Sequence, residues 1–224
     1  MAASPQDIGT TRDYFENHKR ARAFPWSLYH APLENDLQRF LQSVAAAHPN
    51  GEVLIIGCGL LHELDRAPEG LRFAVADIDP RAVDAVVARG DSRITAGYVV
   101  APEQAIDNAL ALRESRFAAV YAKEVVEHVL AWPIWLAGIY RALVPGGQLW
   151  ISTPNYGEPW LPALESTVLE AIARRDGFSR REIHPTRFSR ATLARGLRQT
   201  GFADVQVRVP LPRFALTAWA KRPG

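Results

Sequence analysis

The stretch Val53-Leu54-Ile55-Ile56-Gly57-Cys58-Gly59 decides the fold class of this 224-residue chain. It begins as a short, continuously apolar run, which is typical of a strand buried on both faces of a parallel sheet. It ends in two closely spaced glycines, which let the backbone turn tightly and let a ligand approach without a Cβ clash. We therefore expect a buried strand that leads directly into a ligand-binding loop.

Apolar runs and helix-like segments alternate after this stretch. Strands are expected over residues 71–76, 93–98, 117–122 and 148–153, and helices over residues 60–67, 81–89, 102–113 and 133–143. Such alternation predicts βαβ units and a parallel sheet. Pro80 suits the start of the helix over residues 81–89. A further helix over residues 189–199 is expected, capped by Ser189 and stopped by Gly201. Two more strands, 204–209 and 214–221, are expected to pair as an antiparallel hairpin at one edge.

The chain shows no internal repeat and no low-complexity linker, so we expect a single domain over residues 1–224. Helix-like spacing over residues 10–48 predicts an N-terminal helical cap, 1–48. After residue 154 the alternation breaks, and residues 156–183 are expected to form an insertion over the active site.

The composition is that of an average globular protein, with 48% hydrophobic and 22% charged residues. No apolar stretch reaches the ~18 residues that a membrane span needs. The single cysteine, Cys58, excludes an internal disulfide and a multi-cysteine metal site, and a cytoplasmic location is the simplest expectation. The net charge of +2 does not favour nucleic acid as a partner, and nothing in the sequence sets the oligomeric state.

An acidic residue, Asp77, ends the second expected strand about twenty residues after the glycine loop. A carboxylate there can accept hydrogen bonds from both hydroxyls of a ribose, which predicts a nucleoside-containing cofactor. The alternative is a tight strand-to-helix turn in which Asp77 or Asp79 caps the helix. A nicotinamide dinucleotide is disfavoured because His62 stands where G-x-G-x-x-G requires the last glycine.

Five motifs resemble, in order and spacing, those of the class I S-adenosylmethionine-dependent methyltransferases. They are VLIIGCG (53–59), FAVADIDPRAV (73–83), FAAVYAKEVVEHV (117–129), IYRALVPGGQLWISTPN (139–155) and HPTRFSRATLARGLRQTGFADVQV (184–207). The resemblance implies a Rossmann-like α/β fold: a seven-stranded, mostly parallel sheet in the order 3-2-1-4-5-7-6, with the last strand antiparallel and helices on both faces. It also implies S-adenosylmethionine as cofactor, bound by Gly57, Cys58, Gly59, Asp77, Ile78, Ala122 and Lys123.

The chain departs from the family pattern at two positions. The family usually carries an acid at the position of Ile55 and a further glycine at the position of Leu61, and both residues are apolar here. Glu52, Glu63 or the aromatic cap residues are candidates to replace the acid. The departures leave open a cofactor-binding but inactive partner subunit as an alternative function.

The segment EVVEHV, residues 124–129, carries the second chemical signal. A helix beginning here would place Glu124, Glu127 and His128 on one face, where His128 could act as general base with Glu124 beside it. The segment is similar to the metal-binding stretch of ubiquinone-biosynthesis O-methyltransferases and to that of small-RNA 2′-O-methyltransferases, which add a downstream histidine. The resemblance implies a possible Mg²⁺ or Mn²⁺ site at Glu124, Glu127, His128 and His184; pocket lining and a purely structural role remain alternatives.

The residues that contact the substrate are expected to come from the N-terminal cap and from the insertion. Its candidate residues are Trp26, Tyr29, His30, Tyr156 and His184. Aromatic walls suit a small, partly apolar molecule, although each aromatic residue could equally pack in the core. We therefore expect a methyltransferase that acts on a small-molecule substrate, at an oxygen atom, with His128 as the candidate base.

Overall fold

The computed structural model describes residues 27–101, 104–112, 114–159, 161, 162, 167, 170, 174 and 184–224. Its elements are α3 (Ser27–Ala47), β1 (Glu52–Ile56), the short 3-10 helix η1 (His62–Arg66), β2 (Arg72–Asp77), α4 (Pro80–Val87), β3 (Ile94–Val99), α5 (Ile106–Ala109), β4 (Phe117–Lys123), the 3-10 turn η2 (Val126–His128), α6 (Trp132–Ala142), β5 (Leu143–Pro154), α10 (Arg190–Thr200), β6 (Ala203–Arg208) and β7 (Ala215–Lys221). Trp26, the first part of the expected cap and most of the expected insertion lie outside the described residues.

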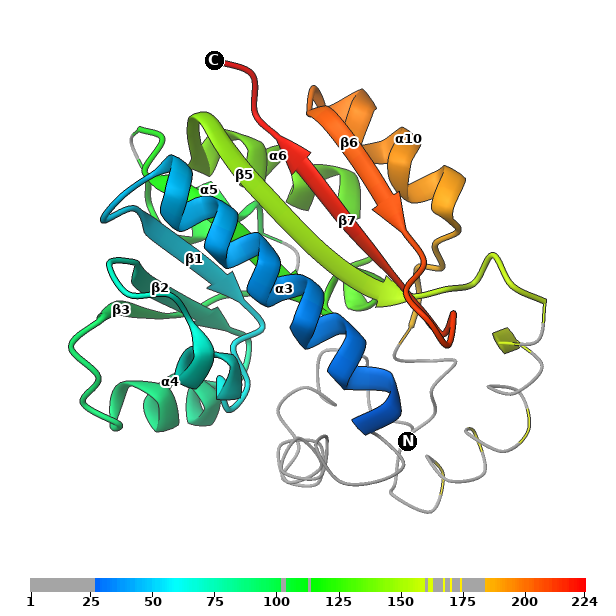
Figure 1. The fold of residues 1–224 in the computed structure, drawn as a ribbon, viewed down its shortest axis with the longest axis horizontal. Helices are drawn as coiled ribbons and strands as arrows, with labels where there is room; N and C mark the ends of the chain where they lie inside the picture. Colours follow the sequence, from blue (N-terminus) through cyan, green and yellow to red (C-terminus); the bar gives the residue numbers. More distant parts are fainter. Residues whose placement is uncertain are drawn as a thin grey trace.

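The sheet has seven strands in the order β3-β2-β1-β4-β5-β7-β6, which confirms the expected order (Figure 1). Strands β3, β2, β1, β4 and β5 pair in parallel, and β7 pairs antiparallel with both β5 and β6. Because the first five strands run the same way, their carboxyl ends gather at one edge of the sheet, where ligands bind in open α/β folds.

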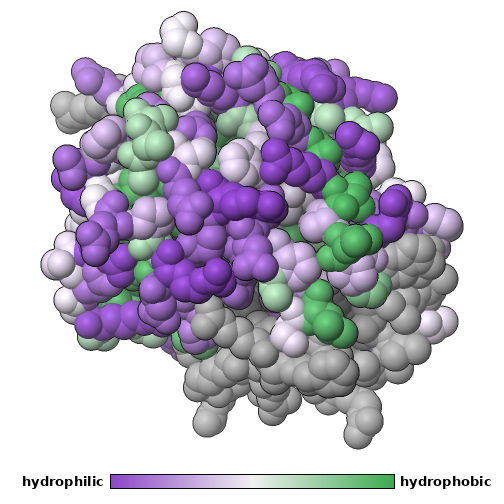
Figure 2. Space-filling view, viewed as in Figure 1, coloured by the Kyte–Doolittle hydropathy of each residue, from purple (hydrophilic) through white to green (hydrophobic). Residues whose placement is uncertain are grey.

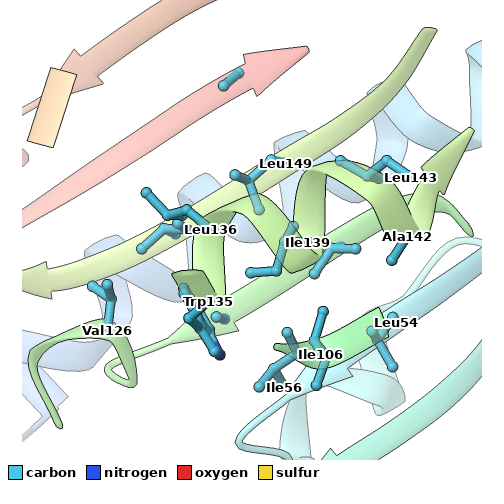
Figure 3. Close-up of a cluster of buried hydrophobic side chains, with 14 of the residues drawn as sticks. Leu54, Ile56, Ile106, Val126, Trp135, Leu136, Ile139, Ala142, Leu143 and Leu149 are labelled. Atoms are coloured by element: carbon cyan, nitrogen blue, oxygen red, sulfur yellow. The ribbon is translucent and has the colours of Figure 1, made fainter. Parts of the chain in front are cut away.

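Helices cover both faces of the sheet, as expected, and β1 shows why its sequence is continuously apolar. All five of its residues are buried. Val53 and Ile55 pack in a cluster with α3, η1 and α4, whereas Leu54 and Ile56 pack with α5 and α6 on the other face (Figure 3). A strand with helices on both sides has no solvent-exposed position, so the alternation of a half-exposed strand is absent.

Two helix boundaries confirm sequence signals. Pro80 opens α4, and the Asp79 side chain accepts a hydrogen bond from Arg81 N at 2.9 Å, so Asp79 is the helix cap. Ser189 begins α10 with a capping box shared with Thr192, and Gly201 ends it in the left-handed region.

Two other helix expectations are corrected. The helix expected to begin at Glu124 does not form, because Glu124 has φ +57° and only Val126–His128 make a 3-10 turn. Glu124, Glu127 and His128 therefore do not share a helical face. The helix expected over residues 102–113 is limited, among the described residues there, to the four residues of α5.

The surface over α3 is predominantly hydrophilic (Figure 2). Within α3, Asn35, Arg39 and Gln42 are exposed, whereas Leu37 and Leu41 are buried against the sheet. Among the described residues, no helix combines the length and the apolar character needed to cross a membrane.

A buried carboxylate, Asp36, fastens α3 to the sheet. Its Oδ2 accepts hydrogen bonds from the indole nitrogens of Trp150 on β5, at 3.0 Å, and Trp219 on β7, at 2.9 Å. Its Oδ1 accepts from Arg39 at 3.0 Å and from Arg208 at 3.3 Å. The side chain is buried, with only 2% of the residue exposed, so these donors replace the water that the charge would otherwise need.

We predict that Asp36→Asn lowers the free energy of unfolding by about 1–3 kcal/mol, because a neutral amide leaves buried donors poorly paired. Urea unfolding followed by tryptophan fluorescence measures the change. Asp84→Asn is the matched control, since Asp84 is exposed on α4, and it should have little effect. Equal stabilities of the two variants would contradict the proposed role of Asp36.

The Asp36 contribution should also depend on pH. Burial acts to raise the pKa of the Asp36 carboxyl, but hydrogen bonds from Trp219 and Trp150 outweigh burial and leave that pKa below its usual value. A carboxyl whose pKa is lower in the folded state stabilises the fold in its charged form. This stabilisation is complete above the unfolded-state pKa of about 3.9, and it is lost as the pH falls through the folded-state pKa. The stability difference between wild type and Asp36→Asn should therefore be constant from pH 7 to about pH 5 and shrink below about pH 4; a difference that grows in acid would contradict this.

Candidate active site

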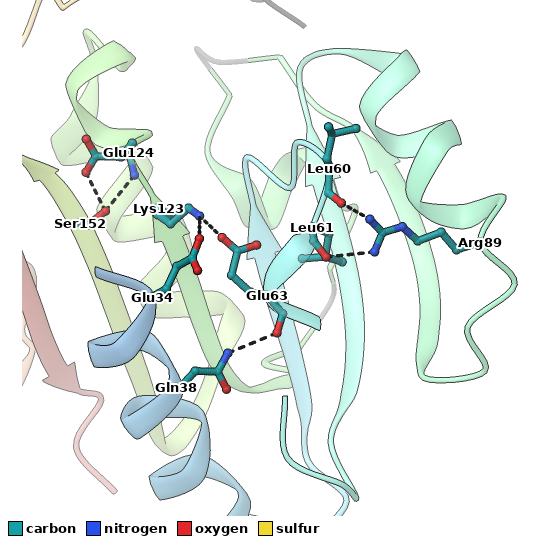
Figure 4. A network of polar contacts seen from close by, with 9 residues as sticks. All are labelled: Glu34, Gln38, Leu60, Leu61, Glu63, Arg89, Lys123, Glu124 and Ser152. Atoms are coloured by element: carbon teal, nitrogen blue, oxygen red, sulfur yellow. Dashed lines mark hydrogen bonds and ion pairs between the residues drawn. The ribbon is translucent and has the colours of Figure 1, made fainter. Parts of the chain in front are cut away.

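The glycine loop after β1 is held from two sides. Gly57 N donates to the carbonyl of Ala76 at 2.8 Å, which ties the loop to β2. From the turn after α4, Arg89 donates to the carbonyl oxygens of Leu60 and Leu61, to the latter at 3.1 Å (Figure 4). These contacts fix the backbone of the loop before a ligand binds, which lowers the entropic cost of binding.

Asp77 lies beside this loop at the end of β2. Its Oδ2 accepts from Gly59 N at 2.9 Å and its Oδ1 accepts from Asp79 N at 3.0 Å. An ionised carboxylate has about four acceptor positions, so beyond these two backbone bonds and the hydrogen bond with the Cys58 thiol it keeps capacity for a ribose hydroxyl. Asp77 thus organises the loop and still fits the role that the sequence predicts for it.

Three further predicted cofactor residues differ in their exposure to solvent. Cys58 is 5% exposed and burial raises the pKa of its thiol, so the sulfur stays neutral. Ala122 is fully buried in the cluster that faces α6. Ile78 is partly exposed after β2. A neutral thiol suits a spacer better than a nucleophile.

Glu124, directly after β4, is held in a left-handed conformation by the neighbouring strand. Its backbone N donates to Ser152 Oγ at 3.1 Å, and Ser152 Oγ donates to its Oε1 at 2.8 Å (Figure 4). Its Oε2 accepts a hydrogen bond from the Tyr29 hydroxyl, on the first turn of α3. Strained backbone of this kind persists only where the surroundings enforce it, and it concentrates at functional sites.

A second group lies just beyond Glu124. Glu127, His128 and His184 each have one atom able to ligate a metal, and these three atoms lie within 4.8 Å of one another. The rings of His128 and His184 meet edge to face with centroids 4.8 Å apart, and Tyr156 Oη lies 2.7 Å from His184 Nδ1. Glu127 is 1% exposed, so its carboxylate is buried beside the two imidazoles.

Lys123, the last residue of β4, meets two acidic residues from other elements. Its Nζ contacts the carboxylate of Glu63, on η1, and lies 3.8 Å from Glu34 Oε1, on α3 (Figure 4). The backbone carbonyl of Glu63 also accepts a hydrogen bond from Gln38 Nε2 at 3.2 Å. These contacts join the segment after the glycine loop to α3.

The structure divides the predicted site residues into groups. Tyr29 joins Glu124, whereas Tyr156 and His184 join His128 and Glu127. Of the four predicted metal ligands, the structure brings together Glu127, His128 and His184 among the described residues, whereas Glu124 contacts Ser152 and Tyr29. His30 lies beside Tyr29, with ring centroids 5.0 Å apart, and Trp26 lies outside the described residues.

Sequence reasoning missed three residues that shape the site. Ser152, Glu34 and Arg89 each contact a predicted site residue or the glycine loop. A serine within a buried strand such as ISTP is an available signal for Ser152, because a hydroxyl there needs a partner. Nothing in the local sequence marks Glu34 or Arg89, whose partners lie far along the chain.

This fold is that of a methyltransferase domain. A family model described as a methyltransferase domain matches residues 27–207, and the chain belongs to that family. The chain therefore contains a methyltransferase domain of the class I S-adenosylmethionine-dependent type, as the motif order predicted. The described residues fit this cofactor, since Asp77 keeps acceptor capacity and the preformed glycine loop lies next to it.

Several known proteins are similar to this chain. The mouse (Mus musculus) mitochondrial ubiquinone biosynthesis O-methyltransferase is 34% identical over 149 residues, which cover 56% of this chain and 38% of that protein. Among solved structures, a Haemonchus contortus phosphoethanolamine N-methyltransferase 2 has a TM-score of 0.70 at 16% identity. The match covers 100% of this chain and 61% of the Haemonchus chain. The magnesium protoporphyrin IX methyltransferase of Synechocystis PCC 6803 has a TM-score of 0.66 at 14% identity, covering 97% of both chains.

We predict that Gly57→Ala is more destabilising than Gly90→Ala. Both glycines have left-handed backbone, with φ +71° and +67°, so both variants lose about 1–2 kcal/mol to backbone strain. A Cβ on Gly57 would lie 2.4 Å from Val125 Cγ2, whereas a Cβ on Gly90 meets nothing within 4 Å. The steric clash should add about 1–3 kcal/mol at Gly57.

Urea unfolding of both glycine variants measures this difference. The double variant Gly57→Ala/Val125→Ala should recover part of the loss, because the smaller side chain at residue 125 makes room. Equal losses for the two single variants would show that the loop does not pack against the segment after β4.

Proposed function

We propose that this protein transfers the methyl group of S-adenosylmethionine to an oxygen atom of a small molecule. The single observation that carries the proposal is the position of His128, which lies with His184 and Tyr156 just beyond the carboxyl end of β4, at the sheet edge that carries the glycine loop and Asp77. An imidazole there can take a proton from a weakly acidic hydroxyl. The name of the mouse relative, an O-methyltransferase, supports oxygen as the acceptor atom.

The cofactor side of the proposal uses the residues around the loop. Gly57 and Gly59 supply close backbone approach, with Cys58 as a neutral spacer between them. Asp77 holds the ribose hydroxyls, and Ile78, Ala122 and Lys123 complete the binding site. S-adenosylmethionine supplies an electrophilic methyl group when it is bound, so these residues serve to orient it toward the acceptor.

The acceptor side uses the two groups after β4. His128 would take the acceptor's hydroxyl proton at an imidazole nitrogen, which would prepare the oxygen to accept the methyl group that bound S-adenosylmethionine supplies. His184 packs against His128, and Tyr156 fixes the ring of His184 through its Nδ1 contact of 2.7 Å. Glu124 and Tyr29 face one another across the end of β4 and contribute a polar wall, with His30 beside Tyr29.

Metal-assisted transfer is the second candidate function, and the convergence of Glu127, His128 and His184 within 4.8 Å favours it. A mixed set of carboxylate and imidazole ligands suits a cation such as Mn²⁺ better than Mg²⁺, which prefers oxygen ligands. In this version the same three residues hold the ion, and His128 is a ligand rather than the base.

The test is a methyl-transfer assay with S-adenosylmethionine and a panel of phenols, catechols and hydroxybenzoates. We predict that His128→Asn lowers kcat by about 100-fold or more, the usual range for loss of a general base, while the affinity for S-adenosylhomocysteine stays within about twofold of wild type. His48→Asn is the matched control, because His48 directly follows the last residue of α3, at the end of that helix opposite to Tyr29.

Each alternative gives a different result in this assay. Loss of activity with EDTA and its return with Mn²⁺ or Mg²⁺ would favour the metal-assisted reaction. Tight binding of S-adenosylhomocysteine without turnover of any acceptor would favour the inactive partner subunit. Full activity of His128→Asn would exclude His128 as the base. Cytoplasmic location and the small-molecule partner stay predictions.

A further inference from the structure

We propose that Lys123, Glu63 and Glu34 form a clamp for the amino-acid end of the cofactor, in which the lysine takes the carboxylate and the acidic residues take the amino group. The proposal rests on the proposed function, since it assigns residues to the same cofactor. The three side chains come from β4, η1 and α3 and meet next to the glycine loop (Figure 4).

The place of the cluster in the sheet matches the length of the ligand. Asp77 ends β2 and Lys123 ends β4, and β1 with its glycine loop lies between them. Two strand spacings separate these ends by roughly 10 Å. With the ribose on Asp77, the thioether chain crosses over the loop, and its amino-acid group arrives at the end of β4.

The charges of the cluster also match the ligand. The cluster contains one ammonium and two carboxylates, so it offers both signs of charge. The side chains are 22% exposed for Lys123, 7% for Glu63 and 14% for Glu34, so water screens their charges only partly. An amino-acid zwitterion carries one charge of each sign, so its carboxylate can pair with the lysine and its ammonium with the acidic residues.

Two strand residues next to the cluster are apolar or aromatic and buried. Ile55 and Tyr121, side by side on β1 and β4, belong to the apolar cluster beneath α3 and are no more than 3% exposed. Side chains alternate along a strand, so Lys123, two residues after Tyr121, points to the same side of the sheet. Lys123 therefore follows directly on this apolar floor, and its ammonium meets Glu63 and Glu34 there.

The test compares three adenosine ligands by calorimetry. S-adenosylhomocysteine carries the whole amino acid, its decarboxylated aminopropyl analogue keeps only the amino group, and 5′-methylthioadenosine lacks both. Lys123→Met should weaken S-adenosylhomocysteine about tenfold or more and bring its affinity close to that of the decarboxylated analogue. Glu63→Gln should weaken both amino-containing ligands, and neither variant should change 5′-methylthioadenosine affinity more than about twofold.

Matched controls separate this role from a structural one. Lys221→Met and Glu69→Gln remove exposed charges elsewhere and should leave all three affinities unchanged. Asp77→Ala should weaken all three ligands, because each carries the ribose. Equal losses for all three ligands in the Lys123 and Glu63 variants, or no loss of S-adenosylhomocysteine, would overturn the clamp alone. Failure of the wild type to bind any of them would overturn the cofactor assignment as well.

Discussion

The buried carboxylate of Asp36 is the interaction on which the site geometry depends. It joins α3 to two strands that follow it by more than a hundred residues, since Trp150 and Trp219 lie 114 and 183 positions further along the chain. A buried charge is tolerated only where donors surround it, so α3 can sit in one register on the sheet. That register decides where the first two turns of α3 place Tyr29 and Glu34.

The parallel sheet supplies the second constraint. Because β1, β2 and β4 end at the same edge, the glycine loop, Asp77 and Lys123 are neighbours although they lie far apart in the sequence. The chain leaves β4 through a strained residue, Glu124, which Ser152 on β5 holds in place. The strain turns the Glu124 side chain toward α3, while the following 3-10 turn carries His128 toward His184.

The sequence predicted the fold well where local pattern and burial agree. The apolar run of β1, the Pro80 and Ser189 helix starts and the closing hairpin all have local signals, and the structure confirms them. It failed at Glu124, because helical propensity says nothing about a hydrogen bond from Ser152, 28 residues away. The Asp36 network and the Lys123 ion pairs were likewise beyond local reasoning, since they depend on which elements the finished sheet brings together.

These constraints meet in α3, which contacts both halves of the site. Through Glu34 it reaches Lys123 and the segment after the glycine loop, and through Tyr29 it reaches Glu124 at the exit of β4. A shift of α3 would therefore disturb cofactor and acceptor sides together, whereas a shift of α4 would reach the loop through Arg89 alone among the contacts described above. The buried anchor at Asp36 thus resists a displacement of α3 that would disturb both halves of the proposed reaction at once.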